Sequence, residues 1–195
     1  MSLFGWLAPV RAAIARALEG RGGAPVPPEL HEAELPESVM RARSMVGAGF
    51  YCLGAGGRDP SAPRPFGACN HPSTHTHGRY GKALFCDCSG FVAWCCGLPR
   101  KSAEGVWLYT DQLEADARGQ VKGDLGDGVP WHLAQPGDLI VYGAGKAIGH
   151  VGIVSEVDDA GPVKVIHCQA SRAPAVVETS PAVFERHKAV ILRLR

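Results

Sequence analysis

The feature that most constrains the fold is a change of pattern near residue 136. After this point the chain carries four short runs rich in β-branched and aliphatic residues, which are typical of strands: 139–142, 151–156, 163–168 and 189–194. Residues 158–161, Asp-Asp-Ala-Gly, form a short turn sequence between the second and third runs, so we expect these two to pair as an antiparallel hairpin. The C-terminal third therefore predicts an antiparallel sheet.

The first part of the chain predicts helices instead. We expect a short amphipathic helix over residues 1–20, a Gly- and Pro-rich linker to residue 36, and a second helix from about 37 to 49. Further helices are expected over residues 88–97 and 110–118. Helices followed by strands indicate an α+β fold, with an N-terminal helix and linker at 1–36 and one folded domain at 37–195.

Composition excludes several classes of protein. The 195 residues are 46% hydrophobic and 20% charged, which suits one globular domain. A net charge of +1 gives no basic surplus for nucleic acid, and no apolar run is long enough for an integral membrane segment.

The cysteines and the N-terminus bear on location. Seven cysteines, several crowded between positions 86 and 96, are unlike a secreted disulfide framework and favour a reducing compartment. The first positive charges follow the apolar stretch at 3–10, the reverse of the order in a secretory signal. We expect synthesis in the cytoplasm without a clear signal peptide, with export by a non-Sec route left open.

A candidate nucleophile lies in the sequence Asp-Cys-Ser-Gly-Phe-Val at residues 87–92. Asp87 is a good N-cap for the helix that follows, so Cys88 falls in the first turn. Unpaired N–H groups and the helix dipole at that position favour a thiolate, and the same N–H groups can stabilise an oxyanion. Cys88 needs only a base beside it to act as a nucleophile.

Two histidines on predicted neighbouring strands can supply the base and its orienting partner. His150 precedes Val151 and Ile153 and alternates with them, so the apolar pair can enter the core while the histidine faces a cleft. His167 lies on the next strand and can accept the N–H of His150, which is the role of a third triad member.

These segments resemble the NlpC/p60 family of cell-wall cysteine peptidases. The resemblance rests on Asp-Cys-Ser-Gly at 87–90, Pro-Gly-Asp-Leu at 136–139, Gly-His-Val-Gly-Ile at 149–153 and Ile-His at 166–167. It implies a papain-like fold with the nucleophile at a helix N-terminus packed on an antiparallel β-sheet. It also implies a triad of Cys88, His150 and His167, and cleavage of peptidoglycan stem peptides near the D-glutamyl residue.

Three further residues are expected at the substrate. Tyr51 begins Tyr-Cys-Leu-Gly, which resembles a Tyr-x-x-Gly stretch upstream of the family's nucleophile, although a core aromatic is an equal alternative. Asp87 can meet a free amino group of the substrate, unless its carboxylate only caps its own helix. Ser89, next to the nucleophile, completes the expected substrate-binding set.

The sequence also departs from the family pattern. The segment 54–85 is long and rich in histidine, and we expect no secretion signal of the kind usual in the family. Within it the spacing of Cys69, His71, His75 and His77 offers a weaker candidate for zinc, with a solvated loop as the alternative. We otherwise expect no metal and no cofactor.

Together these features predict a cysteine peptidase or amidase that hydrolyses an amide bond in peptidoglycan stem peptides, of the D-glutamyl–diamino acid type, through a thioester. The expected partner is a peptide, derived from peptidoglycan. Two alternatives remain open: a thiol-dependent acyltransferase or amidase on another acyl substrate, and an inactive binding module with a zinc-stabilised His/Cys loop.

Overall fold

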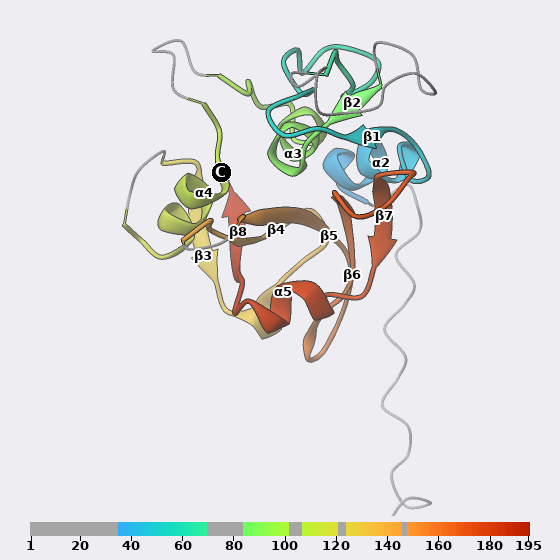
Figure 1. Cartoon of the computed structure of the whole chain (residues 1–195). Helices are drawn as coiled ribbons and strands as arrows, with labels where there is room; N and C mark the ends of the chain where they lie inside the picture. The colour runs from blue at the N-terminus through green and yellow to red at the C-terminus, as the bar shows by residue number, and fades with distance from the viewer. Residues whose placement is uncertain (1–34, 70–83, 102–106, 121–123, 146–147) are drawn as a thin grey trace, which may run out of the picture. The chain divides into compact units, whose positions relative to one another are not determined.

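The computed structural model describes residues 35–69, 84–101, 107–120, 124–145 and 148–195 (Figure 1). All of them fall within one compact unit, His31–Arg195. The helix expected over residues 1–20 and nearly all of the linker lie outside the described residues. Among those that are described, no helix is long and apolar enough to cross a bilayer.

Helices come first along the chain and the main sheet follows, as the sequence predicts. The elements in chain order are α2 (Glu37–Ser44), β1 (Phe50–Tyr51), β2 (Phe85–Cys86), α3 (Cys88–Cys95), α4 (Thr110–Ala117), β3 (Gly126–Val129), η3 (Trp131–Leu133), β4 (Leu139–Tyr142), β5 (His150–Asp158), β6 (Gly161–Cys168), β7 (Val176–Thr179), α5 (Ala182–Arg186) and β8 (Val190–Leu194).

Six strands form one antiparallel sheet in the order β3-β8-β4-β5-β6-β7. The turn at 158–161 joins β5 to β6, as expected. β1 and β2 form a separate parallel pair beside α3, which Figure 1 shows above the sheet. The α+β fold class is confirmed.

The two faces of the sheet carry different cores. On one face Leu139, Val151 and Ile153 pack against α3 and its neighbours, in the larger apolar cluster. On the other face Ile140 and Val154 pack around Phe184 of α5. Alternation along β5 therefore assigns residue 151 to the α3 face and residues 150 and 154 to the α5 face.

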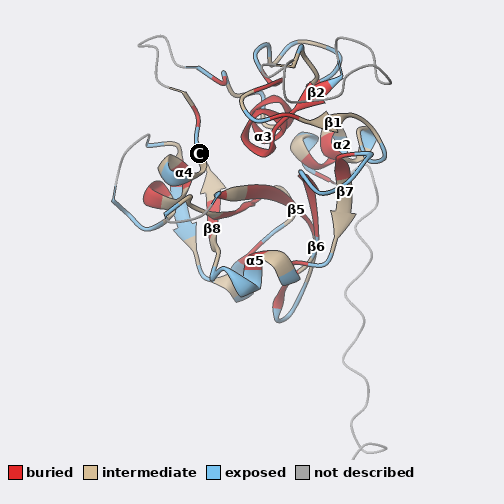
Figure 2. Cartoon of the chain, viewed as in Figure 1, coloured by how far each residue is buried: buried red, intermediate tan, exposed pale blue. Residues whose placement is uncertain are grey.

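α3 is the most buried helix of the described chain. All eight of its residues are buried, and Figure 2 shows it red throughout. Asp87 caps it as predicted, since its carboxylate accepts the Gly90 N–H at 2.7 Å. The helix ends at Cys95, two residues short of the predicted Gly97. Gly97 has a φ of 66°, a left-handed conformation that favours glycine and follows the end of the helix.

Candidate active site

The sulfur of Cys88 lies against the start of β5. Its thiol contacts the backbone N–H groups of Val151 and Ser89 and the hydroxyl of Tyr51. Val151 is the residue directly after His150, so the candidate nucleophile lies beside the backbone of β5 one residue from the candidate base. Tyr142 of β4 stands opposite His150 in register.

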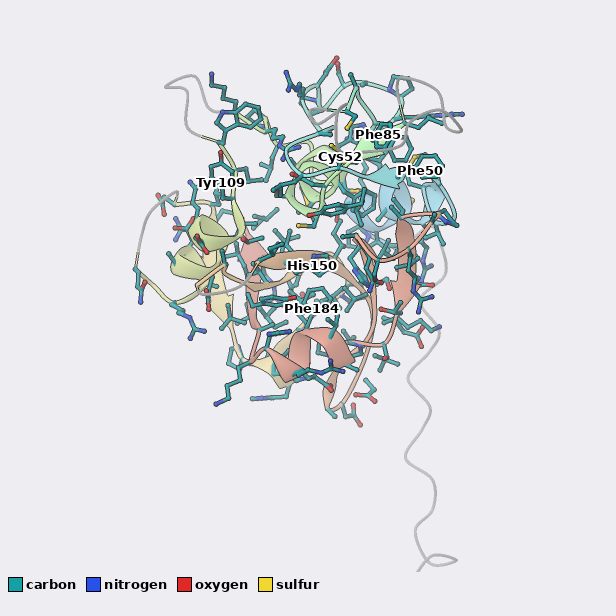
Figure 3. All side chains as sticks on the ribbon, in the orientation of Figure 1. Phe50, Cys52, Phe85, Tyr109, His150 and Phe184 are labelled. Carbon is teal, nitrogen blue, oxygen red and sulfur yellow. The ribbon has the colours of Figure 1, made fainter. Side chains whose placement is uncertain are left out.

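The predicted histidine pair is present. His150 Nε2 and His167 Nδ1 are 2.8 Å apart, a hydrogen bond between neighbouring strands. The sequence correctly predicts Val151 and Ile153 in the core. His150 points to the opposite face, where its ring stacks on Phe184 with centroids 5.3 Å apart (Figure 3). Cys88 packs in the cluster on the α3 face, whereas the His150 ring packs on the α5 face, so the contact of the thiol with β5 is to the backbone of Val151.

The ring of His150 is held on several sides. Phe184 stacks on it at an interplanar angle of 19°, and His167 meets it edge to face at 81°. The ring centroid of Tyr142 lies 6.2 Å from that of His150, and the Tyr142 ring stacks on His187. Nε2 of His150 is taken by His167, so Nδ1 is its ring nitrogen without a hydrogen-bond partner among the described residues, and the nitrogen that could accept a proton.

Burial keeps the thiol and the imidazole neutral. It raises the pKa of Cys88 to about 11, with the Asp87 charge adding to the effect. It lowers the pKa of His150 to about 3, and the nearby His167 and His187 act in the same direction. No hydrogen bond joins Cys88 to His150 within the described parts of the chain. The resting site is therefore a thiol and a neutral imidazole rather than a preformed ion pair, because burial outweighs the preference for a thiolate that the helix N-terminus predicts.

Tyr51 lies close to the thiol, where the resemblance implies a tyrosine. Burial raises its pKa, and the neighbouring Cys88 adds to the shift. Tyr51 is only half-buried and its apolar part packs on the core, so the structure is compatible with both expected roles. The Ser89 hydroxyl donates to Asp87 Oδ1 at 3.2 Å, so its main described partner is inside the protein.

The Asp87 carboxylate is fully engaged. Besides capping α3 it accepts the Gly54 N–H at 2.6 Å and forms a buried ion pair with Arg100. Its side chain is only 3% exposed. These contacts match the capping alternative, and they leave no free oxygen aimed at a substrate amine.

Arg100 is a buried residue beside the site that the sequence analysis did not predict. It is buried, and besides its pairing with Asp87 its guanidinium donates to the carbonyl oxygens of Ala55 and Gly56. It thus ties the Gly-rich segment before the nucleophile to the N-terminus of α3. An arginine after Gly-Leu-Pro carries no signal of burial in the sequence.

Of the candidate zinc ligands only Cys69 lies within the described residues. Its sulfur is 3.0 Å from that of Cys52. His71, His75 and His77 lie outside the described residues. Over the described ranges there is no group of three or more His, Cys, Asp or Glu side chains that could hold a metal ion. The zinc site stays a sequence-based prediction.

Comparison with known proteins bears on the family. The model of the CHAP domain family matches residues 78–169, just under half of the chain and a span that contains Cys88, His150 and His167. Over this span the chain is similar to the CHAP domain family. No curated protein matches the chain significantly.

Two solved structures are similar over larger parts of the chain. One is the P60 domain of an antigen from M. avium subspecies paratuberculosis, with 22% identity, a TM-score of 0.43 and coverage of 74% of this chain and 82% of that one. The other is described as similar to lipoprotein, NLP/P60 family, from Staphylococcus aureus, with 19% identity, a TM-score of 0.44 and coverage of 88% and 44%. At these identities and scores the two structures carry no weight on function.

Proposed function

We propose that this chain is a cysteine peptidase or amidase that hydrolyses an amide bond of peptidoglycan stem peptides through a thioester. The observation that carries the proposal is the contact of the Cys88 thiol, at the start of α3, with the backbone N–H of Val151, directly after His150, which is hydrogen bonded to His167. The CHAP-domain match over the same residues supports the cell-wall substrate class.

The first half of the reaction forms the thioester. Nδ1 of His150 takes the thiol proton as Sγ of Cys88 attacks the carbonyl carbon. The backbone N–H of Cys88 has no acceptor among the described residues, so it is free to donate to the oxyanion. When the tetrahedral intermediate collapses, the C–N bond breaks and the leaving amine takes the proton from His150.

The second half restores the enzyme. Water gives a proton to His150 and attacks the thioester carbon, the C–S bond breaks, and the proton returns to sulfur. The neutral resting pair requires proton transfer during the attack, so substrate must bring sulfur and ring into line. Hydrogen bonds at a catalytic site are often loose before substrate binds.

Within this proposal the scissile bond joins D-glutamate to the diamino acid, the bond type that the family resemblance implies. The test is mass spectrometry of a panel of purified tri- and tetrapeptide muropeptides after incubation with the protein, with Cys88→Ala as control. We expect a product pair from cleavage after D-glutamate with the wild type and none with Cys88→Ala. Labelling of Cys88 by a thiol probe without cleavage of any muropeptide would favour an acyltransferase or another amidase instead.

A further inference from the structure

A line of three polar side chains crosses three neighbouring strands on the α5 face of the sheet. His150 lies on β5, His167 on β6 and Thr179 on β7, and these strands are adjacent in Figure 1. His167 is paired in register with Val177, so Thr179 is its diagonal neighbour on the same face. His167 Nε2 and Thr179 Oγ1 are 3.0 Å apart.

The far end of this line favours one direction. The Thr179 hydroxyl lies 3.0 Å from the Ser180 carbonyl oxygen, which can only accept, so this contact uses the single hydroxyl proton. With its proton directed at Ser180, Thr179 Oγ1 accepts at its other contact. Nε2 of His167 then carries a hydrogen and donates it.

The protonation of each ring nitrogen then follows in turn. A neutral His167 with a hydrogen on Nε2 has a bare Nδ1, which can only accept from His150 Nε2. His150 with its hydrogen on Nε2 has a bare Nδ1, the atom that the proposed mechanism needs as base. The reverse arrangement would place a hydrogen on His150 Nδ1 and leave no base.

We propose that Thr179 is a positioning residue that selects the reactive tautomer of His150 by acting through His167. This inference rests on the proposed function for its catalytic consequence, but the tautomer that it assigns is a property of the resting protein. Burial, together with the nearby Arg172, lowers the pKa of His167 to about 4, so the middle ring is neutral near pH 7 as the relay requires.

The residues around His167 favour a stable hydrogen-bond relay from Thr179 through His167 to His150. His167 is 1% exposed, so water cannot readily replace its two partners. Gly152 leaves room for it, because a Cβ on Gly152 would lie 3.1 Å from the Cβ of His167. Thr179 is the last residue of β7, an edge strand, and nothing in its local sequence, Val-Glu-Thr-Ser, indicates a link to the site.

The test compares Thr179→Val, which keeps the shape and removes the hydroxyl, with Thr179→Ser, which restores it. Loss of one hydrogen bond of about 1.4 kcal/mol corresponds to about tenfold, so we expect kcat to fall about tenfold in Thr179→Val with KM little changed. Thr179→Ser should return kcat to within about twofold of wild type. Ser155→Ala is the matched control, because Ser155 donates to Glu178, the neighbour of Thr179, outside the relay.

The second readout is independent of turnover. Nitrogen-15 NMR of histidine-labelled protein at pH 7 reports which ring nitrogen is protonated. We expect both His150 and His167 to be protonated on Nε2 in the wild type and in Ser155→Ala, and a mixture of tautomers in Thr179→Val. If no muropeptide is cut but these spectra are seen, the proposed function fails while the relay holds. Protonation of His150 on Nδ1 in the wild type, or unchanged spectra in Thr179→Val, would overturn the relay.

Discussion

Replacement of Arg100 by methionine should be among the most damaging single substitutions outside the reacting residues. The change removes the buried cation that pairs with Asp87 and leaves the carbonyl oxygens of Ala55 and Gly56 without that donor. Both charged side chains are almost fully buried, at 1% and 3% exposure. Breaking such a pair from one side costs about 3–5 kcal/mol, a large part of the stability of a domain.

Urea unfolding followed by circular dichroism measures this cost. With a denaturant dependence of about 2 kcal/mol per molar, the unfolding midpoint should fall by about 1.5–2.5 M. Arg118→Met is the matched control, since Arg118 pairs with Glu114 on an exposed helix surface and should lose less than about 0.5 kcal/mol. A double variant, Arg100→Met with Asp87→Asn, should recover part of the loss, because the stranded charge is removed with its partner.

If Arg100→Met lowers the unfolding midpoint no more than Arg118→Met does, the contacts of Arg100 with the Gly-rich segment and with Asp87 do not stabilise the fold. If the double variant is no more stable than Arg100→Met, the cost does not come from an unpaired Asp87 carboxylate. The backbone contacts of the guanidinium would then carry the effect.

Three further predictions concern the site. Gly152→Ala should lower activity at least tenfold and destabilise the fold by about 1–3 kcal/mol, because the new Cβ would lie 2.5 Å from Val165 Cγ1. In the control variant Gly67→Ala the new Cβ makes only ordinary van der Waals contacts, so equal stability of the two variants by thermal melting would contradict the prediction. The rate at which iodoacetamide alkylates Cys88 in the substrate-free protein should keep rising from pH 7 to 10, since the pKa of the thiol is raised to about 11. A constant rate between pH 5 and 7 would instead reveal an ion pair with His150. The free energy of unfolding should fall as pH drops below about 6.5. The reason is that His150 and His167 take up protons in the unfolded chain but stay neutral in the folded chain, where their pKa values are lowered to about 3 and 4. Urea unfolding curves that coincide at pH 7 and pH 5 would contradict this.

The sequence predicts those strands that have a recognisable local pattern of residues. β4 and β5 are recognisable as short runs rich in β-branched and aliphatic residues, and α3 because Asp87 precedes an apolar run. β3, Gly-Asp-Gly-Val, has no such pattern and exists because β8 pairs with it from the far end of the chain. The insertion of β8 between β3 and β4 is a long-range pairing that no local window contains.

The candidate site divides in the same way. Cys88 and the two histidines occur in short motifs that indicate chemistry when they are taken together and in order, so the sequence predicts them. Phe184, which stacks on His150, comes from a five-residue helix whose position depends on the rest of the sheet. The direction in which His150 points is likewise decided by tertiary packing, because alternation states only that it opposes Val151 and Ile153.

The most direct test of the central claim is capture of the acyl group on Cys88. Purified protein is mixed with a tripeptide muropeptide, quenched in acid within a single turnover, digested and mapped by mass spectrometry. We predict a thioester of the D-glutamyl fragment on the peptide that contains Cys88 in the wild type, and no adduct in His150→Ala over the same interval. An acyl group on another residue, or hydrolysis that persists in Cys88→Ala, would contradict the account.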